Sequence, residues 1–184
     1  GEVRFNGSNT ELLAESKGMT AQAINTTKND SKIYFNSVVT NIGSKSSFGV
    51  NAIGGNGTAC FTGKDSIVNI DVLVDKNGDG IGDVGDSNAI GVMSDLQVED
   101  GVKEFNITVK GSGVDSKNVG ASNGTAAIFA LSKNVQIDAQ KFTANVVAGV
   151  DKERSDNTYG VRASTGGIVT VNSAVIDIDV TDGK

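Results

Sequence analysis

The 184-residue chain contains no histidine, no proline and no tryptophan, and it has a single cysteine, Cys60. Without histidine there is no Ser-His-Asp or Cys-His catalysis, no imidazole ligand for a metal ion and no imidazole base that works near neutral pH. The single cysteine excludes a disulfide within the chain, and with no cationic neighbour nearer than Lys64 we interpret it as a small buried apolar side chain. In an extracellular protein, stability would then come from size or from bound metal ions.

Positive charge is also scarce. The chain has 16 Lys and Arg residues and 22 Asp and Glu residues, which gives a formal net charge of −6. Nucleic-acid phosphates require clustered basic side chains, so we expect no nucleic-acid partner. No apolar run approaches the roughly 18 residues of a membrane span, so we expect no membrane insertion in this segment. The length fits one domain. We predict one unit over residues 1–184, a segment of something longer, because the sequence starts at Gly1 without a signal peptide and ends in a polar stretch.

A degenerate repeat is the strongest pattern in the sequence. Each copy has a small or aromatic residue, then usually glycine, an aliphatic residue and a small residue. If Gly49, Gly91, Phe129 and Gly160 are equivalent, the copies are separated by 42, 38 and 31 residues. These intervals fall in the range of about 20–50 residues that is typical of solenoids, propellers and arrays. Each copy is followed by alternating apolar and polar residues, most clearly over Val68–Val74, which predicts half-buried strands.

The repeats predict an all-β protein, a right-handed parallel β-helix (solenoid) in which strand, turn, strand and variable loop recur. Helical spacing is weak except over Glu11–Gln22, where the pattern allows a short helix. A β-sandwich or an array of Ig-like adhesin modules is the alternative, because it also produces alternation and turns. The seven phenylalanines occur one or two per repeat, and we expect them to stack inside the coil.

One loop carries a specific metal-binding pattern. In the stretch 75–86, oxygen-bearing side chains stand at positions 1, 3, 5, 9 and 12, Gly80 stands at position 6, and position 7 offers a backbone carbonyl. This pattern resembles the calcium loops of dockerins, although a strand ending at Val74 replaces the flanking helix. An acidic turn that binds no ion is the alternative. The expected ligands of a structural Ca²⁺ are Asp75, Asn77, Asp79, Ile81, Asp83 and Asp86.

Three acidic residues suggest a different class of function. Asp71, Asp177 and Asp179 fall on the predicted outward faces of strands, as carboxylates do in β-helical enzymes that act on pectin, and paired acids can cleave glycosidic bonds. Solvated polar faces explain them equally well, and only Tyr34 and Tyr159 could join them to line a sugar cleft. We expect no enzymatic activity and no catalytic residue. A carbohydrate-active β-helix, either a polysaccharide lyase or a glycoside hydrolase, is the alternative.

The stretch 159–171, Tyr-Gly-Val-Arg-Ala-Ser-Thr-Gly-Gly-Ile-Val-Thr-Val, resembles the repeats of autotransporter passenger domains. These are large surface proteins of Gram-negative bacteria, mostly right-handed β-helices, that act as adhesins or aggregation factors. The resemblance implies an extracellular adhesin segment on the bacterial cell surface that binds a host or bacterial cell-surface protein or glycan. A structural stalk is a further alternative. Exposed terminal coils would allow end-to-end self-association.

Overall fold

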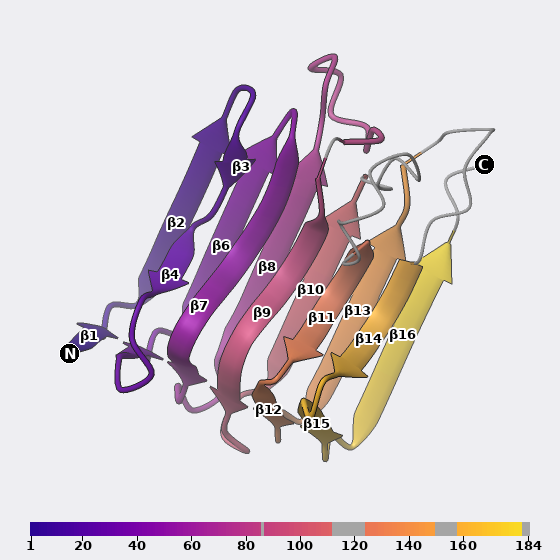
Figure 1. Cartoon of the computed structure of the whole chain (residues 1–184). Helices are drawn as coiled ribbons and strands as arrows, with labels where there is room; N and C mark the ends of the chain where they lie inside the picture. The colour runs from indigo at the N-terminus through magenta and orange to yellow at the C-terminus, as the bar shows by residue number, and fades with distance from the viewer. Residues whose placement is uncertain (86, 112–123, 150–157, 182–184) are drawn as a thin grey trace.

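The computed structural model describes residues 1–85, 87–111, 124–149 and 158–181, and within these ranges the chain forms strands and no helix. No helix capable of crossing a membrane therefore occurs in the described ranges. Figure 1 shows two sheets that lie face to face. The six-stranded sheet consists, in spatial order, of β2 (Asn9–Ser16), β6 (Val39–Ser46), β8 (Ile67–Val74), β10 (Glu104–Lys110), β13 (Lys141–Val147) and β16 (Val175–Thr181).

The ten-stranded sheet forms the other side of the molecule. Its two central strands, β7 (Gly49–Phe61) and β9 (Ala89–Val98), are long and continuous, whereas shorter strands share the same side in the neighbouring coils. These shorter strands are β1 (Glu2–Phe5), β3 (Thr20–Ala21), β4 (Ile24–Thr26), β5 (Lys32–Phe35), β11 (Thr125–Leu131), β12 (Asn134–Ile137), β14 (Thr158–Ser164) and β15 (Ile168–Val171).

All strand pairs among the described residues are parallel. Asn9 pairs with Val39, Val39 with Ile67, and Ile67 with Glu104, so the chain returns to the same sheet one coil further along. This confirms an all-β, parallel, solenoid-like fold. The Ig-like alternative was wrong, because neighbouring strands of such sandwiches are antiparallel. The helix allowed over Glu11–Gln22 was also wrong, since Leu12 and Ala14 of β2 pack on the core at strand spacing.

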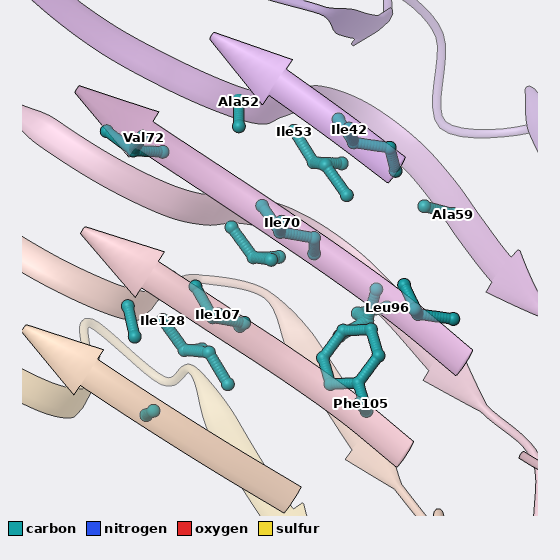
Figure 2. Packing of buried hydrophobic residues seen from close by; sticks show 14 of the residues in the cluster. Ile42, Ala52, Ile53, Ala59, Ile70, Val72, Leu96, Phe105, Ile107 and Ile128 are labelled. Carbon is teal, nitrogen blue, oxygen red and sulfur yellow. The ribbon is translucent and has the colours of Figure 1, made fainter. Parts of the chain in front are cut away.

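The core lies between the two sheets and consists of rows of side chains that run from coil to coil. Ile42, Ile70 and Ile107 occupy one in-register row of the six-stranded sheet and are buried. Figure 2 shows Ile53 and Ile128 of the opposite sheet among the same cluster. The alternation predicted over Val68–Val74 is confirmed, because the valines and Ile70 point inward while the intervening residues face outward.

The outer face of the six-stranded sheet carries its own row, made of amides. Asn69 donates to the Oδ1 atom of Asn41 over 2.9 Å, and Asn106 donates to the Oδ1 atom of Asn69 over 3.1 Å. These three residues are register partners in β6, β8 and β10. Outward-facing side chains therefore also contribute contacts between coils.

A stack of phenylalanines follows one corner of the core, as the sequence predicted for most of them. Successive ring centroids are 5.1, 4.8, 5.4 and 6.2 Å apart. The stack changes sheet between Phe61 and Phe105, where the ring planes are tilted by 59°. Phe61 is in register with Val98 of the next coil, and Val68 is in register with Phe105. At the change of sheet, each of these two coils therefore supplies one ring and one smaller residue to the corner. The stacked residues are Phe5, Phe35, Phe61, Phe105 and Phe142.

The proposed equivalence of the repeat glycines needs correction. The register pairs Asn51 with Ile90 and Ile53 with Val92, which places Gly91 beside Ala52 and not beside Gly49. Ile128 pairs with Val92, so the residue beside Gly91 in the next coil is Ala127 and not Phe129. Ile128 also pairs with Val161, so Gly160 stands beside Ala127 in the coil after that. The shared requirement is a small residue that faces the core, and alanine meets it in two coils.

At the last coil the core is open. Strand β16 pairs with β13, and the described residues place no strand on its other side. Its inward side chains Ile176, Ile178 and Val180 are accordingly 50%, 45% and 40% exposed. This is the kind of apolar end on which end-to-end association would depend. That association stays a prediction.

Gly91 offers a test of this packing. A Cβ atom at this position would lie 2.6 Å from the carbonyl oxygen of Ala127 and 2.6 Å from the Cγ2 atom of Ile107. We expect Gly91→Val to lower the free energy of unfolding by about 1–3 kcal/mol or more, since packed backbone cannot move aside cheaply. Denaturant unfolding measures this loss. Asn145→Ala, on the exposed outward face of β13, should stay within about 0.5 kcal/mol of wild type. Equal stability of the two variants would contradict the assigned packing.

Candidate functional site

The two edges of the coil differ in the length of their connections. At one edge short turns join the sheets, such as residues 62–66 between β7 and β8. At the other, the loop edge, β2, β6, β8, β10 and β13 end and the strands of the ten-stranded sheet begin (Figure 1). The first two connections here, residues 17–19 and 47–48, are also short. Residues 75–88 form the first long one, and it contains the predicted metal ligands.

This loop is hydrogen-bonded to the preceding coil and lies close to a later one. The Asp75 N–H donates to the carbonyl of Ser46 in the preceding coil over 2.9 Å, and the Asp83 N–H donates to the carbonyl of Val74 over 2.7 Å. A Cβ atom on Gly149 would lie 2.6 Å from the backbone of Asp83, so only glycine allows this approach. The loop therefore lies across the edge of the coils that follow it.

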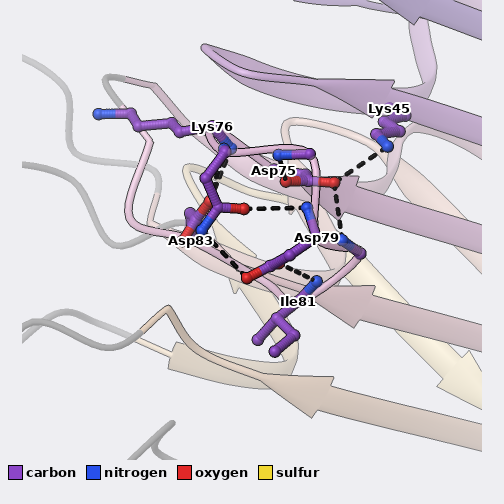
Figure 3. Close-up of polar contacts among 9 residues, drawn as sticks. Lys45, Asp75, Lys76, Asp79, Ile81 and Asp83 are labelled. Carbon is purple, nitrogen blue, oxygen red and sulfur yellow. Dashed lines mark hydrogen bonds and ion pairs between the residues drawn. The ribbon is translucent and has the colours of Figure 1, made fainter.

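The Asp75 carboxylate organises the first half of the loop (Figure 3). Its Oδ1 atom accepts the Gly78 N–H over 2.6 Å, and its Oδ2 atom accepts the Gly80 N–H over 3.1 Å. Both glycines have positive φ angles, +83° and +79°, which side-chain-bearing residues rarely adopt. The glycines thus let the chain wrap around a carboxylate whose side chain is fully buried.

The other predicted side chains belong to the same network. The Oδ2 atom of Asp83 accepts the N–H groups of Lys76 over 2.6 Å and Asn77 over 3.3 Å. The Oδ1 atom of Asp79 accepts the Ile81 N–H over 2.7 Å, and the Asn77 and Asp79 side chains are joined over 3.1 Å. Four of the predicted side chains therefore take part in hydrogen bonds within this loop. Asp86 lies outside the described residues.

Lys45, which the sequence did not indicate, supplies the countercharge. It lies on β6 of the preceding coil, in register with Leu73, and its Nζ atom is 3.0 Å from the Oδ2 atom of Asp75. The hydrogen bond to Lys45, together with the Gly78 and Gly80 N–H groups, holds the pKa of Asp75 below its ordinary value. The same hydrogen bond raises the pKa of Lys45. Only the stacking of coils reveals this pair.

The chemistry of the loop fits a calcium ion. All predicted ligands offer oxygen, which this hard cation prefers, and one of them, Asp75, is already paired with Lys45. In the described part of the chain, no three acidic or cysteine side chains converge closely enough to hold a metal ion.

The remaining candidate residues do not form a second site. Asp71, Asp177 and Asp179 face outward as predicted, but two intervening strands, β10 and β13, separate Asp71 from the other two. Asp177 and Asp179 stand roughly 7 Å apart along β16, on an exposed face. Cys60 is buried, which confirms its interpretation as a small buried side chain, and burial raises the pKa of its thiol.

Comparison with known proteins gives no relative for this fold and loop. No protein-family model matches the chain, and no curated protein or solved structure matches it.

Asp75 predicts a pH dependence of stability. Its pKa is lower in the folded than in the unfolded protein, so its stabilisation is complete above about pH 4 and is lost as the pH falls through the folded pKa. We expect Asp75→Asn to lower the melting temperature at about pH 6, and the gap to wild type to narrow steadily below about pH 4. Asp71→Asn, on the exposed outer face of β8, is the control and should show no such gap. A difference in melting temperature between wild type and Asp75→Asn that is equally large in acid would contradict the pairing of Asp75 with Lys45.

Proposed function

We propose that this chain is a non-enzymatic adhesin segment of an extracellular bacterial surface protein, and that its loop edge binds a protein or glycan on a host or bacterial cell. The observation that carries the proposal is the length of the loop of residues 75–88, because the coil can be closed at this edge by much shorter connections. Residues 17–19 and 47–48 close the same edge in earlier coils with short turns. Residues 75–88 therefore add surface without a role in closing the coil, which favours an adhesin over a plain stalk.

We infer a right-handed winding for the coil. Connections between parallel strands of one sheet are right-handed in about 98% of cases, because the twist of the strands favours that crossover. A right-handed β-helix agrees with the resemblance to autotransporter passenger domains, and with it the cell-surface location.

We propose further that the loop binds one structural Ca²⁺ ion. The side chains of Asp75, Asn77, Asp79, Asp83 and Asp86 and the carbonyl of Ile81 would hold it. The internal N–H contacts of the carboxylates support this, because they already hold those side chains within one loop. The ion would fix the shape of the loop surface and would take no part in catalysis.

Calcium should therefore stabilise the protein. A site with a dissociation constant of about 10⁻⁴–10⁻³ M suits an extracellular module, and at ten times that concentration it stabilises the fold by about 1.4 kcal/mol. We expect calcium to raise the melting temperature by a few degrees and to slow proteolysis within residues 75–88. Asp79→Ala should abolish both responses, whereas Asp177→Ala should retain them. Identical melting of wild type in calcium and in chelator would show that the loop is only an acidic turn.

Cell binding tests the adhesin function. The wild-type chain should bind cultured host cells or bacteria, and a variant in which Gly-Ser replaces residues 76–87 should lose that binding while its circular dichroism stays unchanged. A variant with alanines in the opposite turn, residues 99–101, is the matched control. Binding that survives loss of the loop would contradict the role of the loop edge. Complete lack of binding by wild type would favour the stalk, and release of reducing ends from polysaccharides would favour the enzyme.

A further inference from the structure

The outer face of the ten-stranded sheet contains a groove that is separate from the loop of residues 75–88. Its volume is about 430 Å³, within the range of small-molecule sites. The groove has polar walls with two apolar side chains, Met93 and Leu131, in its lining. Its polar side chains come from four amides and one cation, namely Gln22, Asn25, Asn51, Asn56 and Lys133.

Gly54 is part of the lining of the groove. In the outer row of the sheet it stands between Asn25 of β4 and Met93 of β9, and because it has no side chain the Gln22 amide can lie over it. The register of β7 against β9 also shifts between Gly54 and Thr58, which bends the strand at this point. A Cβ atom on Gly54 would meet the Nε2 atom of Gln22, so a larger residue would displace that amide.

The lining matches the chemistry of a sugar. Each amide offers both a donor and an acceptor, the pair that neighbouring hydroxyl groups require, while Met93 and Leu131 can contact the C–H face of a ring. The lining contains no acidic residue, although the chain as a whole has a net charge of −6. A polar ligand that is neutral or negative therefore meets no repulsion from the walls.

Asn51 is the residue that most clearly lacks a partner. Its Oδ1 atom is buried and accepts no hydrogen bond among the described residues, and its Nδ2 atom meets only the Met93 sulfur at 3.9 Å. Rotating the Asn51 amide by 180° would exchange its oxygen and nitrogen atoms and would still leave one of them without a hydrogen bond. Buried polar groups normally have a partner. The Met93 side chain is flexible, and its movement would let a ligand hydroxyl reach this amide.

Lys133 adds a preference for negative charge. Its Nζ atom donates to the Oδ1 atom of Asn56 over 3.2 Å, which uses one of its three N–H donors. The two others can bind a carboxylate, and hydrogen bonds between charged groups are the stronger kind.

We propose that this groove binds an oligosaccharide segment and places a carboxylate-bearing sugar unit at Lys133. This inference rests on the proposed adhesin function and makes a glycan its partner class. The Asn25, Asn51 and Asn56 amides bind sugar hydroxyls, and Met93 moves aside to admit the ligand.

Calorimetric titration with two matched probes tests the groove. Cellobiouronic acid and cellobiose differ in one carboxylate, and we expect the acid to bind about tenfold more tightly. Lys133→Met should remove that difference, and Asn25→Ala, at an exposed position, should weaken binding of both sugars. Asn145→Ala, on the exposed outer face of β13, is the control and should change nothing.

The outcomes separate this inference from the adhesin proposal. Saccharide binding that falls in the Lys133 and Asn25 variants supports the groove even if the chain does not adhere to cells. No titration signal with either sugar, from a chain that does adhere to cells, overturns the groove and leaves the adhesin function standing. Equal binding of the two sugars, unchanged in Lys133→Met, overturns the role of the carboxylate.

Discussion

The inward side chains of each coil pack against the opposite strand of that coil and, above and below, against the neighbouring coils. No coil has a closed core, so the same row must be filled again at every step, and the isoleucine row of Ile42, Ile70 and Ile107 does this. The row depends on a constant register, because a slip by one residue would turn the apolar side chains outward. Where the stacking stops, at β16, the apolar row is half exposed.

The constant register explains why the loop edge is free to vary. Strand β8 keeps its parallel pairing with β6 before the long connection and with β10 after it, so residues 75–88 extend from the coil without disturbing it. The entropy cost of closing a longer loop grows only logarithmically with its length. A binding surface can therefore change at this edge while the core rows stay the same. Loops that carry binding residues on a rigid scaffold are common in proteins.

The sequence allowed correct predictions wherever one residue type decides the outcome locally. Alternating valines predicted β8, and the acidic, glycine-rich pattern predicted a loop after Val74, whose calcium ion stays a prediction. Predictions from the sequence were wrong or missing where the residue that determines the packing or the charge pair lies in a neighbouring coil. Gly49 was aligned with Gly91 because glycine is conspicuous, whereas the packing requires only a small residue and accepts Ala52. Lys45 gave no signal, since its distance from Asp75 is set by the register of β6 against β8.

The Lys45 pair and a calcium ion are compatible once the charges of the loop are counted. Residues 75–86 contain four aspartates and one lysine, Lys76, which gives the loop a formal charge of −3. Lys45 reduces this to −2, and it does so at Asp75, whose buried carboxylate has the greatest need of a countercharge. The remaining charge equals that of one divalent cation. Asp79 and Asp83 are held by backbone N–H groups and by Asn77, which orient the carboxylates without neutralising them. The lysine of the neighbouring coil thus fixes one end of the loop, and the charge that remains on the loop is the charge that a calcium ion would neutralise.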